Sequence, residues 1–248
     1  MRINGRPVEN WHAGKARNLF QYLLLNRDRV VRREKLFDVL WPDGECSPSG
    51  SSLKVAMHSV RRALEHTGGP AGPAIDIVNR DHGYLLRSKD LWLDLEEFDR
   101  CVDNGRAAET RGAHADALDS YRQAVALYTD DFLAAESGDW ISEQREYNRA
   151  LALHALTRLR ADALHRRDLP AVIKLCRRIL RIDPYHEEVY QSLMLAHGRR
   201  GELGQVRNWH QICVRRLTND LDVTPTATTR RIFHRAVRGE LRRRPGES

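Results

Sequence analysis

Apolar and polar residues alternate along the first 90 positions in the pattern of short helices and strands. Apolar side chains recur every three or four positions in Lys15–Asn26, Arg33–Leu40 and Ser51–Glu65, and this spacing predicts three helices that each bury one side. Within Asp76–Leu86, two apolar stretches flank a polar turn at residues 79–83, which predicts a β-hairpin. Three helices followed by a hairpin are the outline of a winged helix-turn-helix domain.

The segments between these helices have the composition of turns and loops. The pair Asn4-Gly5 favours a tight turn and predicts a small hairpin over residues 1–8. Residues 28–31 are expected to form a turn and a short strand, and Pro42 ends the second helix. Residues 43–50 contain Gly, Ser and Pro and predict a loop, after which a serine at position 49, 51 or 52 caps the third helix.

From about residue 91 onward the pattern is helical. The expected helices are Leu95–Asn104, Ala113–Tyr128, Trp140–His165, Leu169–Ile182, His186–Arg199, Leu203–Leu217 and Thr226–Gly239. Three pairs of residues lie 34 positions apart, which is the tetratricopeptide period: Val172 and Val206, Cys176 and His210, and Ile179 and Cys213. The sequence therefore predicts a mainly α-helical protein: a winged helix-turn-helix domain at residues 1–90, a tetratricopeptide-like bundle at residues 91–239 and a basic tail at residues 240–248.

The third expected helix has one apolar side and one polar, basic side. At 100° per residue, four residues fall within about 40° of one direction and predict the buried stripe: Leu53, Met57, Val60 and Leu64. The side expected to be exposed carries Ser51, Val55, His58, Ser59 and Arg62. Lys54, Arg61 and Glu65 lie on one flank.

The exposed side has the chemistry of a helix that reads the DNA major groove, where base edges present acceptors, donors and the thymine methyl group. Arg62 can bind a guanine with two hydrogen bonds, and Val55 can contact a thymine methyl. His58 and Ser59 can donate to base edges or to phosphates. The residues placed to contact the DNA backbone or the minor groove are Lys54, Arg61, Arg32, Arg33, Arg80 and His82.

The distribution of charge agrees with DNA contact by the first domain. The chain has 248 residues and a formal net charge of +7. Residues 1–90 hold 15 Lys and Arg against 10 Asp and Glu, residues 91–229 hold 19 against 22, and residues 230–248 hold 7 against 2. A basic domain beside a mildly acidic body favours contact of that domain with a polyanion.

Two other interpretations stay open on the residues alone. A basic exposed helix face is often no more than a solvated surface. The helical repeats can instead make the protein an interaction module, with a degenerate first domain that binds DNA without specificity. Four tryptophans are expected to cover core edges rather than to stack on bases: Trp41, Trp92, Trp140 and Trp209.

No catalytic, cofactor or metal motif is recognisable in the sequence. The four Cys lie 37 or more residues apart, which excludes a CxxC half-site and a disulfide framework. Gly14-Lys15 lacks the rest of a phosphate-binding loop, and none of the 11 His belongs to an HExxH motif. The longest apolar run, residues 22–25, is far shorter than the about 20 residues of a membrane span. We therefore expect a cytoplasmic protein that needs no cofactor and is not an enzyme.

Five stretches of the chain carry a resemblance to a known family. They are AGKARNLFQYLLLNRDRVVRREKLFDVLWPD, SSLKVAMHSVRRALE, IVNRDHGYLL, WLDLEEF and RILRIDPYHEEVYQSLMLAHGRRGELGQVRNWHQICVRRLTNDLDVTP. In this order they resemble the Streptomyces antibiotic regulatory protein family, over nearly the whole chain. Members of that family join an OmpR-type winged-helix domain to a bacterial transcriptional activator domain with tetratricopeptide-like helices.

The resemblance implies a sequence-specific transcriptional activator, commonly of a biosynthetic gene cluster in an actinobacterium. Such activators bind direct repeats near a promoter as a dimer or larger assembly and recruit RNA polymerase. By position, Ser51–Arg62 matches the recognition helix, and Arg80 matches a basic residue that contacts the minor groove. The loop Trp41–Gly50, with Asp43 and Glu45, matches the segment that faces the polymerase.

The sequence departs from the family pattern at three places. Relatives usually have another strand before Gly5-Arg6-Pro7, so we expect either a reduced N-terminal sheet or a native chain that is longer at this end. Ser59 stands where relatives often have Arg, which predicts a different or weaker DNA preference. Residues 221–223 replace the usual Leu-Gly pair, and we expect this change to alter only a turn.

Overall fold

The computed structural model describes residues 2–3, 6–7, 14–42, 51–65, 75–88 and 91–241. The chain forms two compact units. The first comprises residues 1–93 together with residues 137–140, and the second comprises residues 94–136 and 141–248. The expected loop at residues 43–50 lies outside the described residues.

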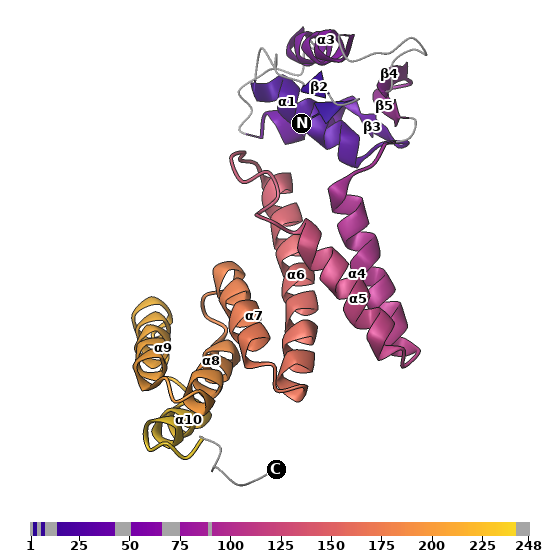
Figure 1. Ribbon diagram of the computed structural model, residues 1–248. Coiled ribbons are helices and arrows are strands. Elements are labelled where there is room, and N and C mark those ends of the chain that lie inside the picture. Colours follow the sequence, from indigo (N-terminus) through magenta and orange to yellow (C-terminus); the bar gives the residue numbers. More distant parts are fainter. Residues whose placement is uncertain are drawn as a thin grey trace. The chain divides into compact units, whose positions relative to one another are not determined.

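The first unit has the order of elements that the hydrophobic pattern predicts (Figure 1). β1 pairs with β2 in a small antiparallel hairpin, as expected from Asn4-Gly5. β5 is the central strand of a three-stranded antiparallel sheet and pairs with β3 on one side and β4 on the other. The bounds are β1 Arg2–Ile3, β2 Arg6–Pro7, α1 Gly14–Leu25, β3 Val30–Arg32, α2 Arg33–Leu40, α3 Ser51–Glu65, β4 Ile75–Arg80 and β5 Gly83–Ser88.

The core of this unit is built from one side of each helix. α1 packs against α3 and β5 and contributes Leu19, Phe20 and Leu23, none of which has exposed surface. α2 contributes Leu36 and Leu40, which are 0% and 2% exposed. Burying these large apolar side chains drives the packing of three short helices that have little stability alone.

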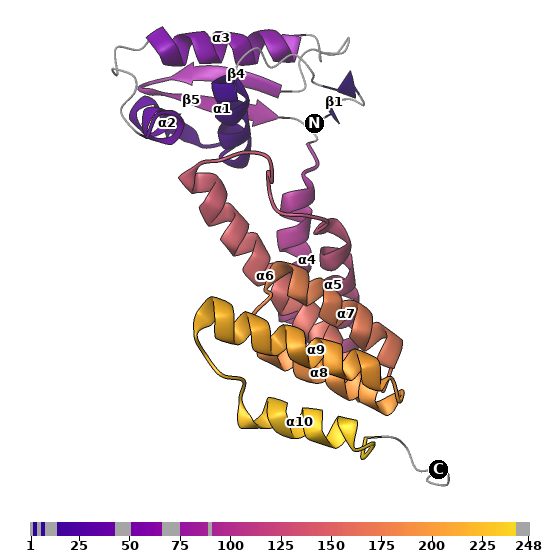
Figure 2. The ribbon, with the colours of Figure 1, turned by 90° about the vertical axis from the view of Figure 1, so that its left-hand side faces the viewer.

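Helices are the only regular elements in the described part of the second unit, and the first two residues of α6, Asp139 and Trp140, belong to the first unit (Figures 1 and 2). α4 lies beside α5, and α8 packs against α7, α9 and α10. The bounds are α4 Asp94–Thr110, α5 His114–Leu127, α6 Asp139–His165, α7 Leu169–Ile182, α8 Glu187–Arg199, α9 Leu203–Arg215 and α10 Ala227–Val237, with a π-helical turn at Arg216–Asp220. The expected fold class is confirmed.

The 34-residue repeat places equivalent residues in the core. Val172 in α7 and Val206 in α9 are both fully buried, and so are Ile179 and its counterpart Cys213. His210, the counterpart of the buried Cys176, is only half-buried, and its ring stacks on Phe233 of α10 with ring centroids 3.8 Å apart. The repeat therefore describes α7 and α9 as structurally equivalent helices.

Three predicted helix ends are wrong by two residues or more, and one of them is the end of α10, which lies at Val237 rather than at Gly239. The helix expected to end at Asn104 continues to Thr110, because Gly105 is an interior glycine that allows α5 to approach closely. A Cβ atom at Gly105 would lie 2.4 Å from the buried ring of Tyr121. The helix expected to reach Leu217 ends at Arg215 and passes into the π-helical turn.

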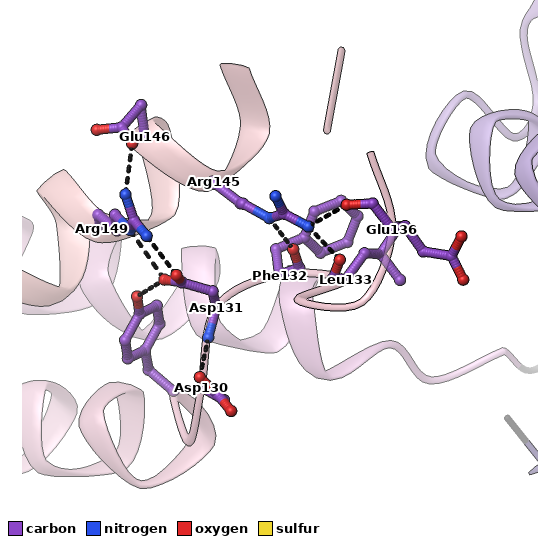
Figure 3. Close-up of polar contacts among 9 residues, drawn as sticks. Asp130, Asp131, Phe132, Leu133, Glu136, Arg145, Glu146 and Arg149 are labelled. Atoms are coloured by element: carbon purple, nitrogen blue, oxygen red, sulfur yellow. Dashed lines mark hydrogen bonds and ion pairs between the residues drawn. The ribbon is translucent and has the colours of Figure 1, made fainter. Parts of the chain in front are cut away.

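The connection between α5 and α6 is held by two arginines of α6 (Figure 3). Arg145 donates hydrogen bonds to three backbone carbonyls, those of Phe132 at 2.7 Å, Glu136 at 2.6 Å and Leu133. The Arg149 guanidinium donates to Asp131 at 2.9 Å and thereby lowers the pKa of that carboxyl group. These contacts satisfy carbonyl groups that an irregular loop cannot pair within itself.

Across the described residues, no helix combines the length and the apolar character that crossing a membrane requires.

Candidate nucleic-acid interface

α3 has the buried stripe that the helical wheel predicts. Leu53, Met57, Val60 and Leu64 are between 0% and 5% exposed. Ala56 joins them at 6%, because its small side chain fits between the helix and the rest of the unit. This burial fixes the rotation of α3 and leaves the opposite face outward.

The outward face holds the five residues that we expect to contact bases. Ser51, Val55, His58 and Arg62 are exposed, and Ser59 is half-buried. The Val55 side chain is 66% exposed, although valine is usually buried in folded proteins. An apolar side chain among exposed polar and basic groups suits a surface that recognises both methyl groups and hydrogen-bonding edges.

Ser59 is less available than the sequence indicates. Its hydroxyl donates a hydrogen bond to the carbonyl of Val55 at 3.1 Å, within the same helix. The proton is therefore committed to the helix backbone, and the oxygen can still accept a hydrogen bond. Ser59 is thus placed to accept from a base amino group rather than to donate to a base edge.

The hairpin of β4 and β5 is tighter than predicted. The strands extend to Arg80 and from Gly83, so that only Asp81 and His82 form the turn. His82 has a positive φ of 62° and is exposed, and Arg80 is exposed at the end of β4. Gly83 faces β3 so closely that a Cβ atom would lie 2.4 Å from the carbonyl oxygen of Val31. The close approach fixes the hairpin turn next to the start of α2.

Arg33 is engaged by this hairpin. Its guanidinium donates to the side-chain oxygen of Asn79 at 3.3 Å and lies 5.7 Å from the centre of the Tyr84 ring. Its backbone N–H donates to the carbonyl of His82 at 2.9 Å. Arg33 therefore joins α2 to the hairpin. The hydrogen bond to Asn79 uses one of its five side-chain N–H donors. Arg32 precedes it and is exposed.

Arg61 has a similar structural contact, whereas Lys54 makes none with the residues that the structure describes. The Arg61 guanidinium donates to the carbonyl of Ile77 in β4 at 3.1 Å, which ties α3 to the sheet. Lys54 is exposed on the same flank of α3. An arginine has five N–H donors, so one structural bond leaves Arg61 able to contact a phosphate as well.

Trp41 packs on its own unit, at the end of α2. Its ring lies 5.4 Å from that of Phe37, and the Lys15 ammonium lies 5.9 Å from its centre. Trp41 remains a predicted polymerase contact, and Asp43 and Glu45 lie outside the described residues. Among the other tryptophans, Trp140 and Trp209 are half-buried as expected, but Trp92 is 65% exposed and covers no core edge.

Lys15 is a basic residue that the sequence reasoning missed as part of this surface. It donates to the carbonyl of Leu40 at the end of α2 and lines a hollow of about 290 Å³ beside α3. Ser51, Val55 and Ser59 line the same hollow. In the sequence, Lys15 is distinguished only as one of five lysines in an arginine-rich chain. Its place beside α3 could not be predicted locally, because that place depends on the packing of α1 against α3.

Two family models match the chain. The model described as transcriptional regulatory protein, C terminal, covers residues 11–86, and the model described as bacterial transcriptional activator domain covers residues 93–238. The regulatory protein DnrI of Streptomyces peucetius is 29% identical over 238 residues, which are 92% of this chain and 85% of DnrI. The transcriptional regulatory protein MoaR1 of Mycobacterium tuberculosis is 24% identical, over 90% of this chain and 72% of MoaR1.

A solved structure has a similar fold. It is Mycobacterium tuberculosis EmbR in complex with a low-affinity phosphopeptide, with a TM-score of 0.70 and 21% sequence identity. The match covers 96% of this chain but 62% of the EmbR chain. The likeness therefore extends over both units, and this chain spans less than two thirds of EmbR.

Proposed function

The chain belongs to the Streptomyces antibiotic regulatory protein family, whose members carry the bacterial transcriptional activator domain, and on this premise we propose that it activates transcription by reading specific DNA sequences with α3. Its relatives DnrI, MoaR1 and EmbR are regulatory proteins by name. One observation carries the proposal: α3 buries its apolar stripe and turns Val55, His58 and Arg62 outward.

The proposed contacts divide by chemistry. Arg62 binds a guanine edge, Val55 meets a thymine methyl, and His58 donates to a base. The groups proposed to contact phosphate or the minor groove are Arg32, Arg33, Lys54, Arg61, Arg80 and His82, to which the structure adds Lys15 as a candidate. Phosphate contacts set the position of the domain on the duplex, and base contacts set its sequence preference.

The proposal includes the partners of a transcription activator. The chain binds direct repeats near a promoter as a dimer, recruits RNA polymerase through the segment that begins at Trp41, and acts on a biosynthetic gene cluster in the cytoplasm. We assign it no catalytic role. These finer points are proposals that follow from the family resemblance, and the name of DnrI supports only a regulatory role.

A second candidate has some structural support. Arg33 and Arg61 each donate a hydrogen bond to β4 of the hairpin, and the Ser59 hydroxyl donates to the backbone of its own helix. A face with fewer free donors suits an interaction module with general, unspecific affinity for DNA. In that case the helical unit carries the function.

One experiment separates the two candidates. Binding of the full chain is measured over a range of salt concentrations to the region upstream of its own gene and to a random duplex of equal length. A specific regulator binds the first at least about 100-fold more tightly at physiological salt. Equal binding to both duplexes, lost steeply as salt rises, contradicts sequence-specific reading and supports the interaction module.

A further inference from the structure

A basic hollow lies on the helical unit. It has a volume of about 270 Å³. Its lining residues come from α5, from the last turns of α6 and from α7. The cationic residues that line it are Arg122, Arg166, Lys174 and Arg178. Within the described residues 91–241, Asp162 is the only carboxylate in its lining. The hollow is therefore a concentration of positive charge.

This charge is opposite to that of the surrounding sequence. Residues 91–229 hold 19 Lys and Arg against 22 Asp and Glu, so the body of the unit is mildly acidic. A second hollow, of about 260 Å³ next to the α5–α6 connection, follows that trend and is lined by Asp94, Asp130 and Asp131. The basic hollow therefore differs in charge from the rest of its unit. The high arginine content of the chain does not explain it, because the unit as a whole is mildly acidic.

The three arginines of the hollow already have partners within the folded unit. Asp162 is shared, because Arg166 donates to it at 2.9 Å and Arg122 lies 3.9 Å away. Arg122 also pairs with Asp119, and Arg178 donates to the carbonyls of Val125 and Tyr128.

Lys174 differs from the three arginines. It is exposed on α7, and none of the described carboxylates lies within ion-pair distance of its ammonium. Arg178 also lacks a carboxylate partner among the described residues, but its guanidinium is half-buried and donates to backbone carbonyls, whereas the Lys174 side chain is exposed at the hollow.

The floor of the hollow is apolar. Val125 and Leu159 are each 6% exposed, Ala163 is 1% exposed, and Leu175 is half-buried at the rim. The volume is slightly below the roughly 300–1,000 Å³ of sites that enclose small molecules. A hollow of this size holds one or two side chains of a bound segment rather than a whole cofactor.

We propose that this hollow docks a short acidic segment of a partner protein, with an apolar side chain on the floor of Val125 and Leu159 and a carboxylate at Lys174. The charges of the two sides are then complementary, which favours encounter and fixes the register of the bound segment. The site lies in the helical unit and does not depend on the DNA contacts proposed for α3.

The test uses the full chain and a displayed library of random peptides of about 12 residues. Wild-type protein selects peptides in the presence of excess random duplex DNA, and the most enriched peptide is then labelled with fluorescein. Its Kd is measured by anisotropy for wild type, Lys174→Glu and Arg177→Glu. Arg177 is the matched control, because it is exposed on the same helix but does not line the hollow.

We expect enriched peptides that carry Asp or Glu next to Leu, Ile or Phe. Lys174→Glu should weaken binding at least fivefold, and Arg177→Glu should change it less than twofold. Three results would overturn the docking site: no enrichment over bare support, enriched peptides without acidic residues, or equal losses in the two variants. Binding of Lys174→Glu to the upstream DNA should equal that of wild type, so failure of the docking site leaves the DNA proposal standing.

Discussion

At the scale of single residues, Arg62 and Lys54 make different kinds of proposed DNA contact from the same helix. Arg62 lies on the outward face of α3, and Lys54 lies on its flank. Arg62→Ala should cost about 1–3 kcal/mol of binding free energy on the specific site and relax the preference at one base pair. The measurement is a set of Kd values for the specific duplex, its single-base variants and a random duplex.

Lys54→Ala is the control for that variant. A phosphate contact is made on any sequence, so its loss should weaken specific and random binding alike. The slope of log K against log salt should fall by about one. If Arg62→Ala shows this same pattern, Arg62 does not read a base.

The half-buried carboxyl group of Asp99 predicts a pH dependence of stability. One of its oxygens is buried without a hydrogen-bond partner, and burial, followed by repulsion from Asp103, raises the pKa to about 6. The folded protein therefore holds this proton more tightly than the unfolded chain does. Between pH 7 and pH 4 the contribution of Asp99 to stability increases as pH falls.

Asp99→Asn should remove the cost of the ionised carboxylate. We expect the variant to be about 1 kcal/mol more stable than wild type at pH 7.5, an amount reduced for partial solvent exposure. The difference should shrink at pH 4.5, where wild-type Asp99 is protonated in the folded state. Urea unfolding followed by circular dichroism measures both values, and a difference that grows at the lower pH would contradict the raised pKa.

At the scale of elements, we expect substitution of glycine by alanine to have opposite effects on stability at two helix positions. Gly105 in α4 faces the fully buried Tyr121 ring, whereas Gly204 in α9 has open space around its Cβ position. Gly105→Ala should destabilise the helical unit by about 1–3 kcal/mol, because α5 must move. Gly204→Ala should stabilise it by up to about 1 kcal/mol, because alanine favours the helix. Thermal unfolding of both variants gives the signs, and a stable Gly105→Ala variant would refute the close packing.

The sequence predicts elements well where their ends are encoded locally. α2, α3 and α7 have the predicted bounds, and in α7 the Asp168 side chain caps the backbone N–H of Ala171 at 3.1 Å. Asp222 adopts a positive φ of 54°, and the expectation that residues 221–223 alter only a turn stays a prediction. The end of α4 was not predictable, because the role of Gly105 depends on a ring from another helix.

The candidate interface was predictable only in part, for a related reason. The periodicity of α3 is a local property and identifies the exposed face correctly. The contacts of Arg33 and Lys15 join residues 46 and 25 positions apart, so no local pattern contains them. The sequence therefore indicates which residues are outward but not which of their donors the fold already uses.

At the scale of the whole molecule, the two units have separate hydrophobic cores. Leu156 of α6 belongs to the main cluster of the helical unit, and Met57 of α3 belongs to the cluster of the winged-helix unit. Both side chains are buried, at 0% and 2% exposure. Since no buried residue is shared between these clusters, each unit supplies its own stabilising apolar burial.

This separation predicts that damage to one core stays in its unit. Leu156→Ala should cost the helical unit about 2–5 kcal/mol, and amide hydrogen exchange should accelerate in α4 to α7 while protection of α1 and α3 is unchanged. Met57→Ala should give the reverse pattern and also weaken DNA binding, because it loosens the buried side of the helix proposed to read bases. Hydrogen exchange measured by mass spectrometry on both variants decides the matter. Faster exchange in both units of either variant would show that they fold as one cooperative body, and loss of DNA binding in Leu156→Ala would then be expected as well.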